Sequence, residues 1–241
     1  MALIDIIKPA ARRAGLATPS VAASSTDGNI VQMVEFANEE AQELAARHPW
    51  QAIRKEASFT TLAAEDQGSV KGICLAANPQ YPFQSIVNET IWNRTQLRPI
   101  FGPKSPAEWQ QLKAQFVQGP WYQYIIRGDH ILFTPVATAG QSCYFEYIST
   151  TNATDSTGTI GKSAMTLDTD LCLLEERLIT LGVVWRFQQA KGLDYTMSYE
   201  KYDSAVLDAM SKDGGKPTLN LKGYNTSVYP GTLVPAGNWT I

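Results

Sequence analysis

The stretch that decides the fold is LCLLEERLITLGVVWRFQQAKGLDYTMSYEKYDSAVLDAMSKDGGKP, residues 171–217. Apolar residues recur three or four positions apart in its first half, which predicts an amphipathic helix; they are Leu171, Leu174, Leu178, Leu181 and Trp185. Gly192 supplies the left-handed residue that ends such a helix, and Asp194 can cap the next one. We therefore expect a helical hairpin that begins near Asp168.

The second helix of this hairpin has an apolar stripe of its own, formed by Tyr195, Tyr199, Tyr202, Val206 and Ala209. Gly214, Gly215 and Pro217 end it. The first helix adds Trp185 and Phe187 to its leucines and valines and is apolar on most of its circumference, so it must be covered on several sides. No recognisable catalytic side chain lies on either stripe, which indicates a structural element, and a neighbouring subunit could supply part of the cover.

Two further helices are expected at the N-terminus. Residues 3–15 form a short one that ends at Gly15, and Asp27 caps a longer one that runs to about Arg47. The stripe of the longer helix consists of Ile30, Val34, Ala37, Ala41 and Leu44. His48 precedes a proline and is therefore pushed out of the helical region, which closes the helix.

The middle of the chain alternates between apolar and polar residues and predicts strands. The expected strands are Trp50–Ala63, Val70–Leu75, Ser85–Arg94, Trp121–Arg127, His130–Pro135 and Ser142–Ser149. A capping box at Ser105–Glu108 opens one short helix, Gly128 and Asp129 form a hairpin turn, and residues 150–167 read as a loop.

This order of elements predicts an α+β fold. The outer helices cannot bury their stripes alone, so the first pair packs against the last pair in a bundle of about four helices. The helical core then consists of residues 1–50 and 165–215, with 51–150 as an inserted antiparallel β-rich subdomain and 151–164 as a loop. Residues 216–241 have no regular period and predict an extended C-terminal arm.

Composition excludes several functions. The chain has 241 residues, 44% hydrophobic and 18% charged, with a net charge of −3, so it is globular and has no general electrostatic attraction to nucleic acid or to an anionic membrane. No run of about 18 apolar residues predicts a membrane span. Three widely spaced cysteines argue against a disulfide framework.

No motif predicts a catalytic residue, a cofactor site or a metal site. His48 and His130 lie in different elements without ligands at metal spacing. Residues 158–163 resemble half of a phosphate-binding loop, but the required preceding glycine is Ser156, so an ordinary loop is favoured. The pairs Glu39–Glu40 and Glu175–Glu176 point about 100° apart on their helices, which favours solvated or intersubunit faces.

Four segments resemble the head-to-tail adaptor proteins of tailed bacteriophages, the group that includes the tail tubular protein A (gatekeeper) type. They are LIDIIKPAARRAGLATP (3–19), ANEEAQELAARHPWQAIRKEASFTT (37–61), TIWNRTQLRPIFGPKSPAEWQQLK (90–113) and the helical hairpin itself, which is the best match. The resemblance implies a structural virion protein and no enzyme. It also implies synthesis in the cytoplasm of the host bacterium and a place at the head–tail interface of the virion.

The resemblance also implies partners. Copies of the chain would form a ring, typically of twelve, below the portal protein. The ring would extend the channel through which DNA is ejected, without sequence-specific binding and without a membrane. It would receive the next tail component, a nozzle or tail-completion protein. The arm would insert against the portal or a neighbouring subunit, with Tyr224, Tyr229, Trp239 and Ile241 as anchors.

Two other functions remain as alternatives. The β-rich subdomain could be a tail or receptor-binding module. A small glycan-active enzyme would need two carboxylates that converge across a groove. The strand region has few acidic residues, among them the scattered Glu56, Asp66 and Glu89, which disfavours the enzyme.

Overall fold

The structure is a computed structural model that describes residues 2–115, 119 and 121–214. Contacts divide the described chain into two units, which are considered separately below. The helical unit consists of Met1–Ala57, Cys74–Ile86 and Glu146–Gly214, and the β-rich unit of Ser58–Ile73 and Val87–Phe145. The predicted arm, residues 216–241, lies outside the described residues.

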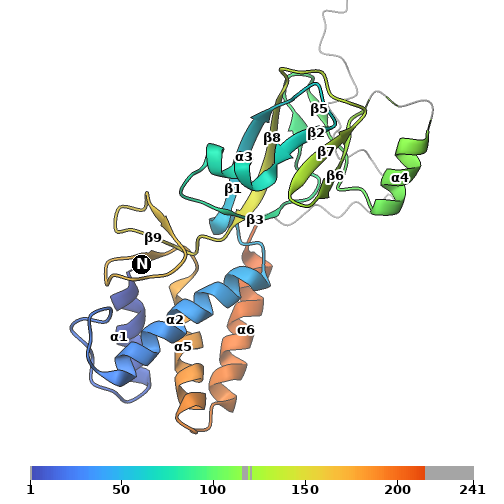
Figure 1. Cartoon of the computed structure of the whole chain (residues 1–241). Helices are drawn as coiled ribbons and strands as arrows, with labels where there is room; N and C mark the ends of the chain where they lie inside the picture. The colour runs from blue at the N-terminus through green and yellow to red at the C-terminus, as the bar shows by residue number, and fades with distance from the viewer. Residues whose placement is uncertain (1, 116–118, 120, 215–241) are drawn as a thin grey trace, which may run out of the picture. The chain divides into compact units, whose positions relative to one another are not determined.

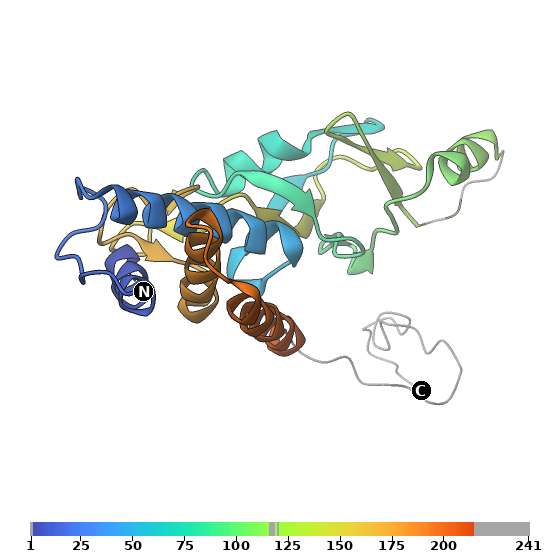
Figure 2. The same cartoon turned by 90° about the horizontal axis from the view of Figure 1, so that it is seen from below.

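Four helices build the core of the helical unit: α1 (Leu3–Arg13), α2 (Gly28–Arg47), α5 (Glu176–Ala190) and α6 (Thr196–Lys212). α5 packs against the other three, and it lies between α1 and α6 in both views, with α2 crossing over it (Figure 1 and Figure 2). Its residues 178–184 are all buried, which confirms that this helix is covered on several sides. The α+β prediction, with a bundle of four helices and antiparallel sheets, is confirmed.

Local signals in the sequence set most helix ends. The Asp27 carboxylate accepts a hydrogen bond from the Asn29 N–H at 2.9 Å and caps α2, and the Asp194 carboxylate accepts one from Thr196 at 3.0 Å before α6. Gly192 has φ 68° and ends α5 as predicted. In α4 (Pro106–Ala114), Ser105 and Glu108 form the expected capping box. On α2, Met33 is buried where the periodicity favoured Val34.

Other expectations were wrong. The hairpin begins at Glu176 rather than near Asp168, and residues 171–172 form a short strand. Val70–Ala77 is a helix, α3, where a strand was expected. The expected strand over 85–94 is divided between β3 and β4, and the expected loop over 150–167 contains β9 and β10. The strands are β1 (Arg54–Thr60), β2 (Asp66–Ser69), β3 (Phe83–Ile86), β4 (Trp92–Asn93), β5 (Arg98–Pro99), β6 (Gln123–Arg127), β7 (His130–Thr134), β8 (Ser142–Ser149), β9 (Ala153–Thr154), β10 (Gly161–Lys162) and β11 (Leu171–Cys172).

The strands form three antiparallel sheets. One has the order β1-β8-β4-β5 with β3 also paired to β8, the second is β2-β7-β6, and the third is the small β10-β9-β11 sheet. The β6–β7 hairpin turns at Gly128 and Asp129, which both have positive φ, as the predicted hairpin turn requires. In the β-rich unit, Phe59 packs against Phe133 and Phe145.

The small sheet connects the two ends of the helical unit. Ala2 forms an isolated bridge with Leu171, and the Leu3 N–H donates to the Asp170 carbonyl at 2.9 Å. The first helix of the chain is therefore fixed directly to the segment that precedes α5.

Candidate assembly surfaces of the helical unit

The sequence analysis missed a cluster of charged side chains in the centre of the helical unit. Glu40 on α2 is fully buried, and its carboxylate accepts hydrogen bonds from Arg186 Nε on α5, at 2.8 Å, and from the Tyr202 hydroxyl on α6. Glu40 was expected on a solvated or intersubunit face together with Glu39, so that prediction is wrong for Glu40. The cluster joins α2, α5 and α6 at one point.

Gly182 makes room for this cluster. A Cβ atom at Gly182 would lie 2.4 Å from the Glu40 side chain, closer than any real contact. The glycine therefore allows α2 to approach α5 closely. Arg186, one turn after Gly182 on α5, then reaches the same carboxylate. Arg186 is buried and requires an acidic partner, because an unpaired buried charge is costly.

This cluster contains more carboxylates than cations. Arg186 also contacts Glu39 at 3.1 Å and Glu43 at 2.5 Å, so three carboxylates face one guanidinium. Burial raises the pKa of Glu40 in spite of the hydrogen bonds from Tyr202 and Arg186. Burial and the hydrogen bond to Glu40 raise the pKa of Tyr202, which therefore keeps its proton and remains a donor.

Three further polar contacts hold α6. Arg47 at the end of α2 pairs with Asp203 at 2.8 Å. At the C-terminal end of α6, Asp213 accepts a hydrogen bond from the Gln51 N–H at 3.1 Å and lies 3.3 Å from His48 Nε2. Only Tyr202 and Val206 of α6 are buried. Polar contacts thus add to the two buried side chains of the predicted apolar stripe in holding α6.

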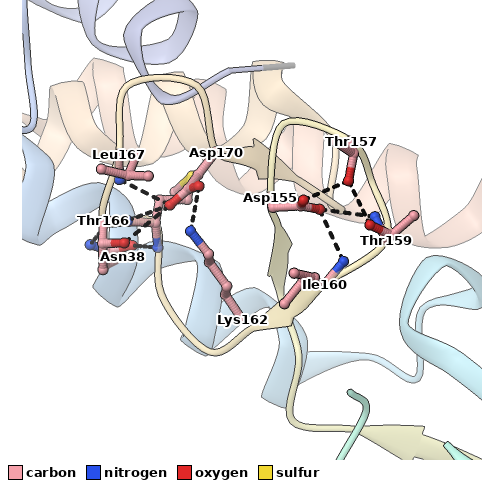
Figure 3. Close-up of polar contacts among 10 residues, drawn as sticks. Asn38, Asp155, Thr157, Thr159, Ile160, Lys162, Thr166, Leu167 and Asp170 are labelled. Atoms are coloured by element: carbon pink, nitrogen blue, oxygen red, sulfur yellow. Dashed lines mark hydrogen bonds and ion pairs between the residues drawn. The ribbon is translucent and has the colours of Figure 1, made fainter. Parts of the chain in front are cut away.

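A second buried carboxylate organises the segment before α5. Asp170 is 0% exposed; it pairs with Lys162 at 2.6 Å and accepts hydrogen bonds from the N–H groups of Thr166 and Leu167 (Figure 3). Burial alone would raise the pKa of Asp170, but the hydrogen bonds from Lys162 and the two amides lower it overall. Asp170 therefore stabilises the loop that lies where the hairpin was expected to begin.

The same segment is attached to the first two helices of the chain. The Asn38 amide on α2 bonds both the N–H and the carbonyl of Met165. The Asp168 carboxylate accepts hydrogen bonds from the N–H groups of Ala22 and Ala23. The linker before α2 and the segment before α5 thus form one continuous surface.

Comparison with known proteins gives the family. The family model described as SU10 adaptor protein matches residues 1–218. The chain belongs to the SU10 adaptor protein family. The predicted resemblance to phage head-to-tail adaptors is therefore confirmed, and the chain is a structural adaptor protein of that class. No curated protein matches the chain.

The loop of this adaptor that resembles half of a phosphate-binding motif has structural partners. Gly161 lies against the Gln80 carbonyl, where a Cβ would be 2.2 Å away, and Lys162 is engaged by Asp170. At the loop tip, the Asp155 carboxylate accepts hydrogen bonds from the Thr157 hydroxyl and from the N–H of Ile160 (Figure 3). These bonds lower the pKa of Asp155 to about 2.

The end of the α5–α6 hairpin of the adaptor presents apolar side chains to solvent. They are Leu193, Tyr195, Met197 and Tyr199, and Met197 is 75% exposed. Trp185 lies near three tyrosine rings, and the Tyr199 ring meets it edge-on at 5.3 Å between ring centroids. This end of the hairpin is therefore a candidate contact surface.

A groove of about 370 Å³ lies between the start of α5 and the end of α6. Trp50, Leu174 and Ala209 supply apolar walls, and charged side chains of both signs line the groove, among them Glu175 and Arg177. The four predicted anchors of the adaptor, Tyr224, Tyr229, Trp239 and Ile241, lie outside the described residues.

Among the described residues, no helix is long and apolar enough to cross a bilayer, and no group of three or more His, Cys, Asp or Glu side chains could hold a metal.

Proposed function

We propose that copies of the chain assemble into a ring, of twelve subunits as the family resemblance implies, that binds beneath the portal protein. The ring extends the DNA channel and provides the platform on which the next tail component docks. The match to the adaptor family over residues 1–218 carries this proposal, because it spans both units of the described chain. The protein acts in the virion, at the head–tail interface.

Two features of the molecule support a structural role. The buried charged groups of the helical unit bond to one another and join helices, so they are used for architecture. The net charge of −3 suits a wall along which DNA slides, since strong phosphate binding would hold the DNA in place.

Binding to the portal tests the proposal directly. The full chain is mixed with purified portal, and the complex is measured by native mass spectrometry and imaged by cryo-electron microscopy. A single closed ring on one face of the portal is expected. Absence of any complex at micromolar concentrations of both proteins contradicts the proposal.

We also propose that the arm, residues 216–241, makes the portal or neighbour contact through Tyr224, Tyr229, Trp239 and Ile241. Replacing the three aromatic anchors by alanine should weaken portal binding and leave the unfolding temperature unchanged. Alanine at Leu207, an exposed residue of α6, is the control. Equal losses in both variants would contradict a specific role for the arm.

A role of the β-rich unit in binding the tail or a receptor is the second candidate. Leu97 is 65% exposed, Phe101 is 42% exposed, and Arg98 lies over the Trp121 ring at 5.1 Å. Aromatic and arginine side chains of this kind are enriched in protein interfaces. Aspartate at Leu97 and Phe101 should then abolish attachment of the tail component while portal binding persists.

The described residues of the β-rich unit do not favour the alternative of a glycan-active enzyme, which needs a pair of carboxylates. The Asp66 carboxylate is engaged by His130 Nδ1 at 2.9 Å and by the Gly68 N–H at 2.8 Å. Glu65 pairs with Lys113. These carboxylates serve local structure, whereas a glycosidase needs two that flank a substrate.

A further inference from the structure

The outward face of α2 carries an acidic stripe, which consists of Glu35, Glu39 and Glu43. Arg47, in the last turn, is the only basic residue of this helix. Glu39 and Glu43 share the single guanidinium of Arg186 with the buried Glu40. Glu35 forms no ion pair with any described residue. The stripe therefore has more negative charge than its own unit neutralises.

The C-terminal half of α1 has the opposite charge. Lys8, Arg12 and Arg13 lie within two turns, and both arginines are exposed. None of the three forms an ion pair with a carboxylate in the described part of the chain. The negative end of the α1 dipole compensates part of this charge, but only within the last turn.

The acidic stripe and the basic end of α1 belong to one unit but to different sides of it. Figure 2 shows α2 along the upper side of the helices and α1 below it. The buried residues of each helix face the core around α5, so the charged residues face outward in different directions. Complementary patches on different sides of one body favour a head-to-tail contact between copies, which closes into a ring when the rotation permits.

We propose that the basic end of α1 in one subunit docks on the acidic stripe of α2 in the next subunit. The inference rests on the proposed ring and identifies the contact that builds it. The charges fix orientation and register and accelerate encounter, since exposed ion pairs contribute little affinity individually. Val31, 44% exposed and one turn before Glu35, adds apolar contact at the same place.

Charge reversal tests this contact in the full chain. The α1-reversed variant carries Arg12→Glu and Arg13→Glu, and the α2-reversed variant carries Glu35→Lys and Glu39→Lys. Each variant alone brings like charges together and should form at least about tenfold less ring than the natural chain at equal concentration. Native mass spectrometry measures the ring, in the presence of portal if the natural chain requires it.

Mixing the two variants gives the decisive measurement. In the mixture, the acidic α1 of the α1-reversed variant meets the basic α2 of the α2-reversed variant. The other contact in such a ring joins the unchanged α1 of the α2-reversed variant to the unchanged α2 of the α1-reversed variant. The mixture should therefore form rings that contain both variants in equal numbers, which neither variant forms alone. The quadruple variant should form rings by itself for the same reason.

The control variant carries Lys71→Glu and Arg127→Glu, which change the net charge by the same amount as the α1-reversed variant, at exposed positions of the β-rich unit. It should assemble like the natural chain. Unfolding temperatures show whether each variant is folded. The inference is overturned if folded reversed variants assemble normally, or if their mixture assembles no better than either alone, while the natural chain still forms rings. A natural chain that forms no ring even with portal overturns the proposed function as well.

Discussion

The Tyr202 hydroxyl on α6 donates a hydrogen bond to the Glu40 carboxylate on α2, and both side chains are buried. This contact joins two helices that are far apart in the sequence. It forms where Gly182 of α5 leaves space for the Glu40 side chain. The first two predictions concern this cluster.

Tyr202→Phe should lower the free energy of unfolding by about 1–3 kcal/mol, because the buried Glu40 carboxylate loses a donor. Urea unfolding followed by circular dichroism measures the change. Tyr199→Phe is the matched control, since Tyr199 is 43% exposed on the same helix, and it should cost less than about 0.5 kcal/mol. Equal effects of the two substitutions would show that the contact with Glu40 is not stabilising.

Gly182→Ala should destabilise the protein by about 1–3 kcal/mol, because the new methyl group overlaps Glu40 and pushes α2 away from α5. Thermal unfolding provides the measurement. Gly28→Ala, at the start of α2, has open space around its Cβ and should be neutral or slightly stabilising. A neutral Gly182→Ala variant would mean that the helices separate without cost.

Asp170→Asn should reduce stability at neutral pH by about 3 kcal/mol, because it breaks a buried ion pair with Lys162. The pKa of Asp170 is lowered in the folded protein, so the carboxylate stabilises the fold above its unfolded value near 3.8 and ceases to do so as the pH falls through the folded value. The difference between natural and variant chains should therefore shrink below pH 3.8. Asp5→Asn, at an exposed position of α1, is the control and should change stability at neutral pH by less than about 0.5 kcal/mol.

Leu97→Asn should raise stability by about 0.5–1 kcal/mol. Leu97 has φ 54°, a conformation that is unfavourable for leucine and tolerated by asparagine, and its side chain is 65% exposed. The unfolding midpoint measures the gain. Leu75→Asn, at a 53% exposed position without positive φ, is the control and should not stabilise the protein. A loss of stability in Leu97→Asn would indicate that the leucine side chain makes a stabilising contact.

Signals local to the sequence predicted most of the fold. Asp27, Gly192 and the Ser105–Glu108 capping box act on neighbouring backbone groups, so their positions set helix ends without reference to the rest of the chain. The apolar stripes of α2 and α5 were sufficient to predict that the first and last helices pack together.

The errors occurred where distant contacts decide the structure. Leu171 and Leu174 fit a helical period, yet the segment pairs with Ala2 and β9, and Asp170 binds Lys162. Residues 70–75 form a short apolar run whose period does not distinguish strand from helix. The Glu40 cluster did leave a signal, since Arg186 is the one charged residue between Leu178 and Phe187 of α5. Its partner could not be identified without the crossing of α2 over Gly182.

Because the first helices pack against the last ones, the helical unit cannot complete its folding until the end of the chain has been synthesised. α1 and α2 emerge from the ribosome without the partner that buries their apolar sides, and that partner, α5, starts only at Glu176. At rates of about 5–20 residues per second, the nascent chain waits on the order of ten seconds with these sides uncovered. During that interval the uncovered apolar sides of α1 and α2 are open to association with other chains, a hazard that ends only when α5 is complete.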